Sequence, residues 1–226
     1  MIKFERKDTQ KAQCAIEALQ NAKMRKSSYN TKEVNEALIE MFYGKCYICE
    51  NKEATSYQIE HLTSHHENID LKYDWNNLLW SCAHCNNTKL AKYEPILDCT
   101  KRDVDELIAF RKTGYFGTDE QLQFEALSTE EEVLNTIQLL QDVYYGTTPQ
   151  KKIEAKVIRK KLRKELHDFK DSVREYQEAE GEEKEDLLFL IKKELKSSSA
   201  FTAFKRWLIR DNGEYYPELA VLLKNN

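Results

Sequence analysis

The middle of the chain carries cysteines at metal-binding spacing. Two Cys-x-x-Cys pairs, Cys46/Cys49 and Cys82/Cys85, flank the 32 residues from 50 to 81. Thiolates at this spacing turn two sulfur atoms toward one point, and two such pairs can complete a tetrahedral shell around Zn²⁺ with no open position. The pattern predicts a structural zinc site. Metal binding would then contribute directly to the folding of a module too small to hold itself together.

Further chemically active side chains lie between and behind these cysteine pairs. Glu60 and His61 close a short apolar segment, Asn77 follows, and Asn86 stands directly behind the last cysteine, with Lys89 three positions on. A zinc ribbon that only supports a loop needs none of these side chains. The stretch therefore raises the question of a second site beside the zinc.

The order of these residues resembles the HNH (ββα-metal) endonucleases, in the subgroup that carries two zinc knuckles. The family pattern is C-x-x-C, an acidic residue with His, Asn-Leu, and a second C-x-x-C followed by His or Asn and, three later, Lys. This chain reads C-Y-I-C, I-E-H, N-N-L-L-W-S and C-A-H-C-N-N-T-K. Every signature position is filled, and the resemblance is specific for residues 44–92.

The resemblance implies a role for each signature residue. His61 would be the general base that deprotonates the attacking water, and Glu60 and Asn86 would place two oxygens on a catalytic divalent cation. Asn77 would hold the loop and fix the orientation of the His61 ring. Lys89 would either contact a phosphate of the substrate or cap the C-terminal end of its helix.

One departure from the family pattern bears on the metal. Asn86 stands where many members have His, so the protein ligands are all oxygen, which favours Mg²⁺ or Mn²⁺ over Zn²⁺ or Ni²⁺. We therefore expect a catalytic Mg²⁺ or Mn²⁺ in addition to the structural zinc. The Pro-Gly pair that often follows the Glu-His step is absent, which leaves the shape of this loop open.

Other side chains of this region have simpler interpretations. His65 and His66 are interpreted as exposed loop residues rather than as metal or phosphate ligands. His84, inside the second knuckle, is expected to point outward because four cysteines already complete the zinc shell. Trp75 and Trp80 are expected to form a small core over the zinc.

The surrounding sequence predicts a mostly helical protein, because Gly and Pro are scarce (6 and 3) and apolar residues recur at helical spacing. Strands are expected only around 57–59 and 78–80, which with a following helix give a ββα unit. We predict a mostly α fold with a small zinc-stapled ββα-metal module, α+β overall. The predicted helices are 8–26, 30–43, 83–93, 103–112, 129–144, 150–179, 183–196, 199–210 and 217–223. The predicted domains are N-terminal helices (1–44), the nuclease module (45–98) and a C-terminal helical domain for partner docking (99–226).

Charge is distributed unevenly in the C-terminal part. Residues 151–174 carry ten Lys/Arg and four Asp/Glu, whereas residues 175–196 carry eight Asp/Glu and four Lys/Arg. The favoured interpretation is a helical hairpin with complementary solvated faces, and the alternative is a basic helix that follows phosphates. The net charge of the whole chain is -4, so it lacks the strong positive field of an autonomous nucleic-acid binder.

Four further segments resemble the PtuB-like HNH effectors of the Septu and retron antiphage systems. They are the YDWNNL run (73–78), the PILD step (95–98), TIQLL (136–140) and SAFTAFKRWL (199–208). This resemblance implies an ABC- or SMC-like ATPase partner (PtuA-like) that supplies affinity for nucleic acid. The side chains Phe201, Phe204, Trp207 and Leu208 would either dock on that partner or pack in the core of the last helices.

The sequence excludes several function classes. No run of eighteen apolar residues and no apolar leader segment exist, so we expect a cytoplasmic protein. Six cysteines are too few for a disulfide scaffold, and no thioredoxin-like pattern surrounds either pair. The function expected is a metal-dependent endonuclease acting on phosphodiester bonds of nucleic acid, with DNA as the expected substrate, in an antiphage complex. The alternative is a non-catalytic zinc module that binds nucleic acid or a protein partner.

Overall fold

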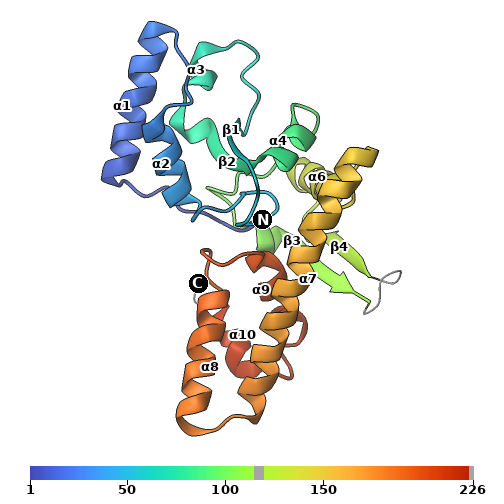
Figure 1. Ribbon diagram of the computed structural model, residues 1–226. Helices are drawn as coiled ribbons and strands as arrows, with labels where there is room; N and C mark the ends of the chain where they lie inside the picture. Colours follow the sequence, from blue (N-terminus) through green and yellow to red (C-terminus); the bar gives the residue numbers. More distant parts are fainter. Residues whose placement is uncertain (115–119, 224–226) are drawn as a thin grey trace.

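The computed structural model describes residues 1–114 and 120–223 (Figure 1). Two-stranded sheets and many helices alternate along the chain, which confirms the predicted fold class. The elements before residue 100 are α1 (Gln10–Arg25), α2 (Lys32–Met41), β1 (Tyr57–His61), α3 (Ile69–Lys72), η1 (Trp75–Asn77), β2 (Leu78–Cys82) and α4 (Ala83–Lys89). Those after it are α5 (Val104–Leu107), β3 (Ile108–Thr113), β4 (Gln121–Ala126), α6 (Glu131–Tyr145), α7 (Pro149–Glu178), α8 (Gly181–Glu194), α9 (Thr202–Asp211) and α10 (Pro217–Leu222).

Two of the predicted helices need correction. The helix predicted over 103–112 is wrong: α5 spans a single turn, and Ile108–Thr113 forms β3, which pairs antiparallel with β4. Phe110 on β3 packs edge-on against Phe124 on β4, so burial against a distant strand overrides the local helical preference. The helix predicted over 83–93 ends at Lys89, because Leu90 adopts a positive φ of 46°.

The ββα unit places the signature residues at one end of its hairpin. β1 and β2 pair antiparallel with Glu60 opposite Leu79 and His61 opposite Leu78. The helix α4 begins directly after Cys82, the last residue of β2. Side chains from the end of β1 and from α4 therefore meet on the same side of this small sheet.

The main hydrophobic core draws residues from the N-terminal segment, the knuckles, both sheets, the upper half of α7 and α9. It contains Phe4 from the N-terminal segment, Ile48 from the first knuckle, Phe110 from β3 and Phe204 from α9. The N-terminal segment itself lies at the centre of the molecule, where Phe4 N donates a hydrogen bond to Cys99 O (2.8 Å). The division into domains 1–44, 45–98 and 99–226 stays a prediction, and the core is continuous across these ranges.

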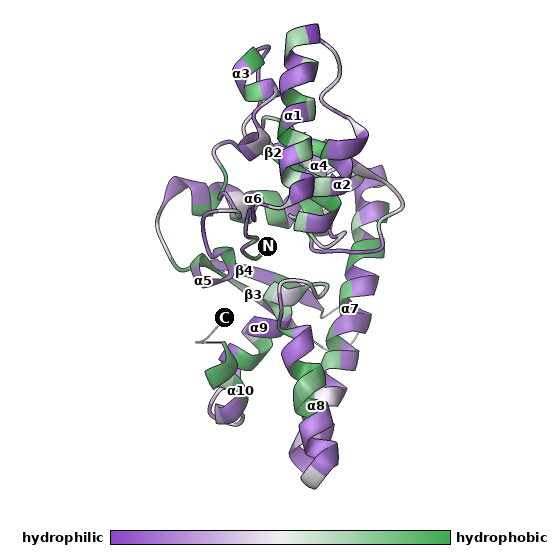
Figure 2. Cartoon of the chain, turned by 90° about the vertical axis from the view of Figure 1, so that its left-hand side faces the viewer, coloured by the Kyte–Doolittle hydropathy of each residue, from purple (hydrophilic) through white to green (hydrophobic). Residues whose placement is uncertain are grey.

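The long helix α7 connects this body to a smaller helical part. In Figure 1 the upper half of α7 lies beside α6 and its lower half lies beside α8. Phe169 and Val173 of the lower half pack with Ile191 of α8 and Leu219 of α10 in a second core. Figure 2 shows the corresponding alternation of hydrophobic and hydrophilic residues along α7 and α8.

The C-terminal aromatic residues belong to the cores. Phe201, Phe204 and Trp207 are buried, and Trp207 Nε1 donates a hydrogen bond to Asp105 O (2.8 Å). Their placement favours core packing over docking on a partner, the two alternatives that the sequence left open. Among the described helices, none is long and apolar enough to cross a membrane.

Candidate functional site

The four knuckle cysteines converge on one buried point. Their Sγ atoms all lie within 4.8 Å of one another, and those of Cys49 and Cys82 are 3.9 Å apart. A tetrahedral zinc ion with Zn–S bonds of about 2.3 Å places its sulfur ligands about 3.8 Å apart, so the cluster fits Zn²⁺. The distance also exceeds the roughly 2 Å of a disulfide bond, and the four thiols are free.

The zinc cluster is held by elements from distant parts of the chain. The loop after α2 supplies Cys46 and Cys49, and the β2–α4 junction supplies the other pair. Tyr47 N donates to Trp80 O (3.0 Å), which ties the first knuckle to β2, and the Tyr144 hydroxyl of α6 donates to Cys49 O (3.0 Å). A metal at this point would therefore join three segments of the main core.

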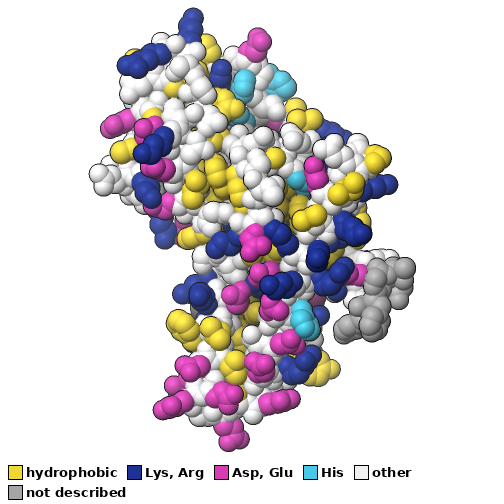
Figure 3. Space-filling view, in the orientation of Figure 1, with side chains coloured by type: hydrophobic (Ala, Val, Ile, Leu, Met, Phe, Trp, Pro, Cys, Tyr) yellow, Lys and Arg dark blue, Asp and Glu magenta, His cyan; other side chains and the backbone are white. Residues whose placement is uncertain are grey.

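A second site lies beside the zinc cluster, in a cavity of about 360 Å³. Its walls come from the end of β1, the loop that follows, and α4. In Figure 3 histidine side chains gather on the exposed surface between α3 and α4. The lining includes Glu60, His61, His65, His66, Asn86 and Lys89.

Glu60 is a buried carboxylate whose oxygens have no partner at full hydrogen-bond geometry. It is 5% exposed, and the Tyr47 hydroxyl and the Lys89 ammonium are the donors close enough to lower its pKa. Lys89 Nζ lies 3.1 Å from Oε1, at ion-pair distance but without hydrogen-bond geometry. Burial raises the pKa of Glu60 to about 7 against the opposing charge of Lys89. A cation in the cavity would keep this carboxylate ionised and satisfy its oxygens.

Asn86 offers an amide oxygen on the same cavity. Its Nδ2 donates to Gln58 Oε1 (2.6 Å), which fixes the amide plane from the side of β1. Its Oδ1 makes no hydrogen bond within the described part of the chain. Glu60 and Asn86 together therefore present hard oxygen ligands, the donor set that suits Mg²⁺ or Mn²⁺.

The two ring nitrogens of His61 differ in their surroundings. Nε2 lies 3.0 Å from Lys72 O, and because a carbonyl oxygen only accepts, Nε2 carries the proton. Nδ1 then has the lone pair of the neutral imidazole. Burial lowers the pKa of His61 below its ordinary value, so the ring is neutral at pH 7. Such a ring can accept a proton from a water in the cavity.

Asn77 ties the loop after β1 to its own segment. Its Nδ2 donates to Thr63 O (2.9 Å) and Leu71 O (3.1 Å), and its Oδ1 accepts from Thr63 N (2.9 Å). Its backbone carbonyl also accepts from Leu62 N (2.8 Å). Asn77 is 6% exposed, so it can position the loop behind His61 but cannot itself reach a substrate.

Lys89 is placed inside the module rather than on its surface. It is 1% exposed, and its Nζ donates to the carbonyl oxygens of His61 (3.0 Å) and Leu90 (3.2 Å). It also lies 3.4 Å from a Glu94 carboxylate oxygen. Leu90 is the C-cap residue of α4, so these contacts favour the helix-capping alternative over contact with phosphate.

Several residues beyond the signature shape the cavity. His65, interpreted from the sequence as an exposed loop residue, is half-buried and packs edge-on against His61 at a ring-centroid distance of 4.8 Å. Tyr29, which the sequence did not single out, packs edge-on against the His61 ring at the same distance. Glu94 accepts hydrogen bonds from both N and Oγ of Ser64. These partners come from the α1–α2 connection, the loop after β1 and the segment behind α4, and no spacing rule in the sequence connects them.

His84 points away from the zinc, as its place in the knuckle predicts, but it is buried against other helices. Its Nδ1 lies 2.7 Å from Glu154 Oε2 on α7, and its Nε2 lies 2.8 Å from Val143 O on α6. Lys151 Nζ of α7 donates to Asn87 O of α4 (2.8 Å) nearby. The start of α7 is thus fastened to the helix that carries Asn86.

Comparison with known proteins agrees with this geometry. Residues 46–92 match the family model described as HNH endonuclease, so the two adjacent sites belong to an HNH endonuclease domain. A curated relative, the Septu protein PtuB of Bacillus thuringiensis, is 33% identical over 97 residues. The match covers 40% of this chain and spans 37% of the length of that relative. No solved structure matches the chain.

Proposed function

We propose that the chain is a metal-dependent HNH endonuclease that hydrolyses phosphodiester bonds of nucleic acid, with DNA as the expected substrate. One observation carries the proposal. A buried carboxylate whose oxygens lack a well-formed hydrogen bond, a free amide oxygen and a neutral imidazole line one cavity inside the HNH domain. This combination supplies cation ligands and a base within one site, which a purely structural zinc module does not require.

His61 is the proposed general base. Lys72 O orients the ring through Nε2, which leaves Nδ1 to take a proton from the attacking water. The lowered pKa keeps the ring unprotonated at pH 7 and therefore ready to accept that proton. Asn77 is a positioning residue, because it fixes the loop that follows His61.

Glu60 and Asn86 are the proposed ligands of the catalytic cation, Mg²⁺ or Mn²⁺. When bound, such an ion supplies charge stabilisation for the phosphoryl and leaving-group oxygens. Burial keeps the pKa of Glu60 raised even beside Lys89, so a further cation would stabilise the ionised carboxylate, whose two oxygens have no well-formed hydrogen bond. The four cysteines hold a separate structural zinc in this scheme.

The biological setting is also a proposal. Similarity to the Septu protein PtuB supports a role as the effector nuclease of an antiphage defence complex. An ABC- or SMC-like ATPase (PtuA-like) is the proposed partner. The net charge of -4 supports an assisted mode of binding, because the chain as a whole lacks the strong positive field of an autonomous nucleic-acid binder.

A second candidate function follows from Lys89. Its ammonium lies 3.1 Å from Glu60, so the chain itself supplies a counter-charge where a cation ligand is proposed. A module with this internal ion pair could bind nucleic acid or a protein without catalysis. The two candidates differ in one property: only the nuclease binds a second divalent cation next to the zinc.

Cleavage of supercoiled plasmid tests the nuclease directly. The purified chain, alone and with the ATPase partner, is incubated with Mg²⁺ or Mn²⁺ and compared with His61→Ala and with single-stranded DNA and RNA substrates. We expect His61→Ala to lower the cleavage rate by about 10²-fold or more while zinc content and circular dichroism stay unchanged. Equal rates for the two proteins would remove His61 as the base.

A further inference from the structure

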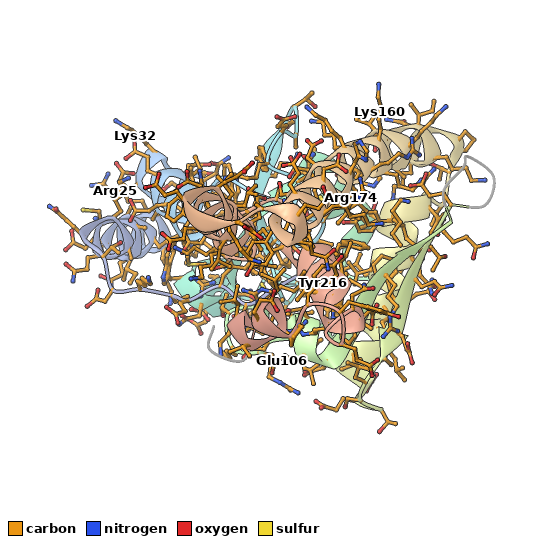
Figure 4. All side chains as sticks on the ribbon, turned by 90° about the horizontal axis from the view of Figure 1, so that it is seen from below. Arg25, Lys32, Glu106, Lys160, Arg174 and Tyr216 are labelled. Carbon is orange, nitrogen blue, oxygen red and sulfur yellow. The ribbon has the colours of Figure 1, made fainter. Side chains whose placement is uncertain are left out.

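The upper half of α7 carries a row of lysines on its exposed face. Lys152, Lys156, Lys160 and Lys164 recur every four residues, and all four are exposed. Residues four apart lie on one side of a helix, so these ammonium groups form a single stripe. With a rise of about 1.5 Å per residue the stripe is about 18 Å long. Lys160 points away from the body of the molecule in Figure 4.

The lysine stripe (Lys152, Lys156, Lys160 and Lys164) is not neutralised by the acidic helix that follows α7. α8 packs against the lower half of α7 through the second core, whereas Ile158 and Leu162 of the upper half belong to the main core. Within the described ranges, none of the four stripe lysines has an ion pair. From the sequence, the basic segment 151–174 and the acidic segment 175–196 are expected to face each other. The upper half of α7, which carries the lysine stripe, does not have this pairing.

Other basic residues of the same half of α7 are used differently. Lys161 forms an ion pair with Glu53 (3.3 Å), Arg163 pairs with Glu120, and Lys151 donates to Asn87 O. The contacts of Lys151 and Lys161 fasten α7 to the HNH domain, and that of Arg163 fastens it to the residue before β4. The four stripe lysines, by contrast, form no ion pair in the described ranges that would stabilise the fold.

The stripe begins next to α4, the helix that forms one wall of the candidate cleavage site. Lys151, one residue before the stripe, contacts the carbonyl of Asn87, the neighbour of the proposed metal ligand Asn86. In Figure 3 the histidine-lined surface and the Lys/Arg side chains along α7 appear on the same face of the molecule. A polyanion bound along α7 would thus lead toward the cavity.

We propose that the lysine stripe of α7 binds the phosphate backbone of the nucleic acid that the HNH site cleaves. This inference rests on the proposed function and adds the surface that holds the substrate. A stripe of about 18 Å spans about five base pairs at 3.4 Å each, and lysine binds phosphates as a point charge without reading sequence. An acidic protein surface is the competing occupant, and continuity with the cleavage cavity favours nucleic acid.

Salt-dependent DNA binding tests this proposal. The full chain with zinc and the His61→Ala change, which prevents cleavage, is titrated with a fluorescent 20-base-pair duplex at several salt concentrations. The stripe variant is Lys156→Gln, Lys160→Gln and Lys164→Gln, because glutamine removes charge but retains helix propensity. The matched control is Lys192→Gln and Lys193→Gln at the end of α8 with Lys196→Gln just after it, where the same charge is lost from exposed positions.

We expect the stripe variant to bind DNA at least about tenfold more weakly at low salt. The slope of log K against log [salt] should fall by about two to three, close to 0.9 per lost phosphate contact, while the control stays within about twofold of its parent. Replacement of the same three lysines by arginine should preserve binding. Equal slopes for the stripe variant and its parent would overturn the proposal.

Two further outcomes separate this proposal from the nuclease assignment. Unchanged DNA binding by the stripe variant, together with metal-dependent plasmid cleavage by the active chain, would reject the stripe and keep the nuclease. Stripe-dependent DNA binding without cleavage would keep the stripe and reject the nuclease. Loss of polyglutamate binding with unchanged DNA binding would assign the surface to an acidic protein and overturn the proposal.

Discussion

The side chain of Asn77 satisfies three backbone groups with its two ends. Thr63 N, Thr63 O and Leu71 O all bond to this one amide, which reaches them from η1. A buried amide group that loses its partner costs about 1–3 kcal/mol. The geometry of His61 should therefore depend on a residue that does not touch the substrate.

We predict that Asn77→Ala lowers the free energy of unfolding by about 1–3 kcal/mol and also slows cleavage, because the loop behind His61 loses its anchor. Urea unfolding and plasmid cleavage measure the two effects. The matched control is Asn76→Ala, an exposed neighbour whose side chain makes no hydrogen bond in the described structure. Equal behaviour of the two variants would contradict a positioning role for Asn77.

At the residue scale, the spacing of residues in the sequence predicted which side chains form the metal cluster, but it did not predict the contacts of Lys89. The cysteine cluster follows from two Cys-x-x-Cys pairs, because four thiolates at that spacing have one favourable arrangement around a metal. The partners of Lys89 could not be predicted, since the carbonyl of His61 and the carboxylate of Glu94 reach it only in the folded module. Charged residues are seldom buried, so nothing in the sequence marked Lys89 as interior.

The cysteine cluster connects elements of the HNH domain. It joins the loop after α2 to the β2–α4 junction, alongside the hydrogen bond from Tyr47 N to Trp80 O. We predict that Cys46→Ser removes the zinc and lowers the free energy of unfolding by several kcal/mol, because metal-binding energy is folding energy in such a module. Zinc content by elemental analysis and thermal unfolding measure both effects.

Cys14→Ser is the matched control for the zinc variant. Cys14 is exposed on α1 and lies outside the cluster, so its replacement should leave both zinc content and stability unchanged. A Cys46→Ser protein that unfolds at the same temperature as Cys14→Ser would show that the cluster does not stabilise the fold.

At the element scale, helices with regular apolar spacing were predictable and the β3–β4 hairpin was not. The apolar stripe of α7 buries residues such as Leu162, Leu166 and Phe169, and its predicted bounds differ by one residue at each end from Pro149–Glu178. The helix predicted over 103–112 failed because β3 is stabilised by β4 and by Phe204 of α9, partners far along the chain. Local periodicity contains no information about such pairing.

One buried carboxylate joins the N-terminus, the first knuckle and the start of α9. Glu50, beside the first knuckle, pairs with the Met1 amino group and with Lys45 (both 3.0 Å) and accepts hydrogen bonds from Thr202 N and Ala203 N at the start of α9. Burial alone would raise the pKa of Glu50, but the two cations lower it to about 2. The carboxylate is therefore ionised and fully partnered inside the protein.

We predict that Glu50→Gln lowers the free energy of unfolding by about 3–5 kcal/mol, because two buried cations lose their counter-charge. Denaturant unfolding measures the change. The matched control is Glu53→Gln, whose side chain is 81% exposed and pairs with Lys161 at the surface. Surface pairs contribute about 0–1 kcal/mol, so the control should stay close to the parent. Equal losses in both variants would contradict the role of Glu50.

The proposed nuclease function depends on a second cation beside the zinc. Binding of Mn²⁺ to the zinc-loaded chain, followed by electron paramagnetic resonance, measures this directly. We expect one weak Mn²⁺ site in the parent, its loss in the Glu60→Gln, Asn86→Ala double variant, and unchanged zinc content in both. Mn²⁺ binding that is the same in the parent and the double variant, or absent from the parent, would contradict the proposed cation site and the nuclease function that depends on it.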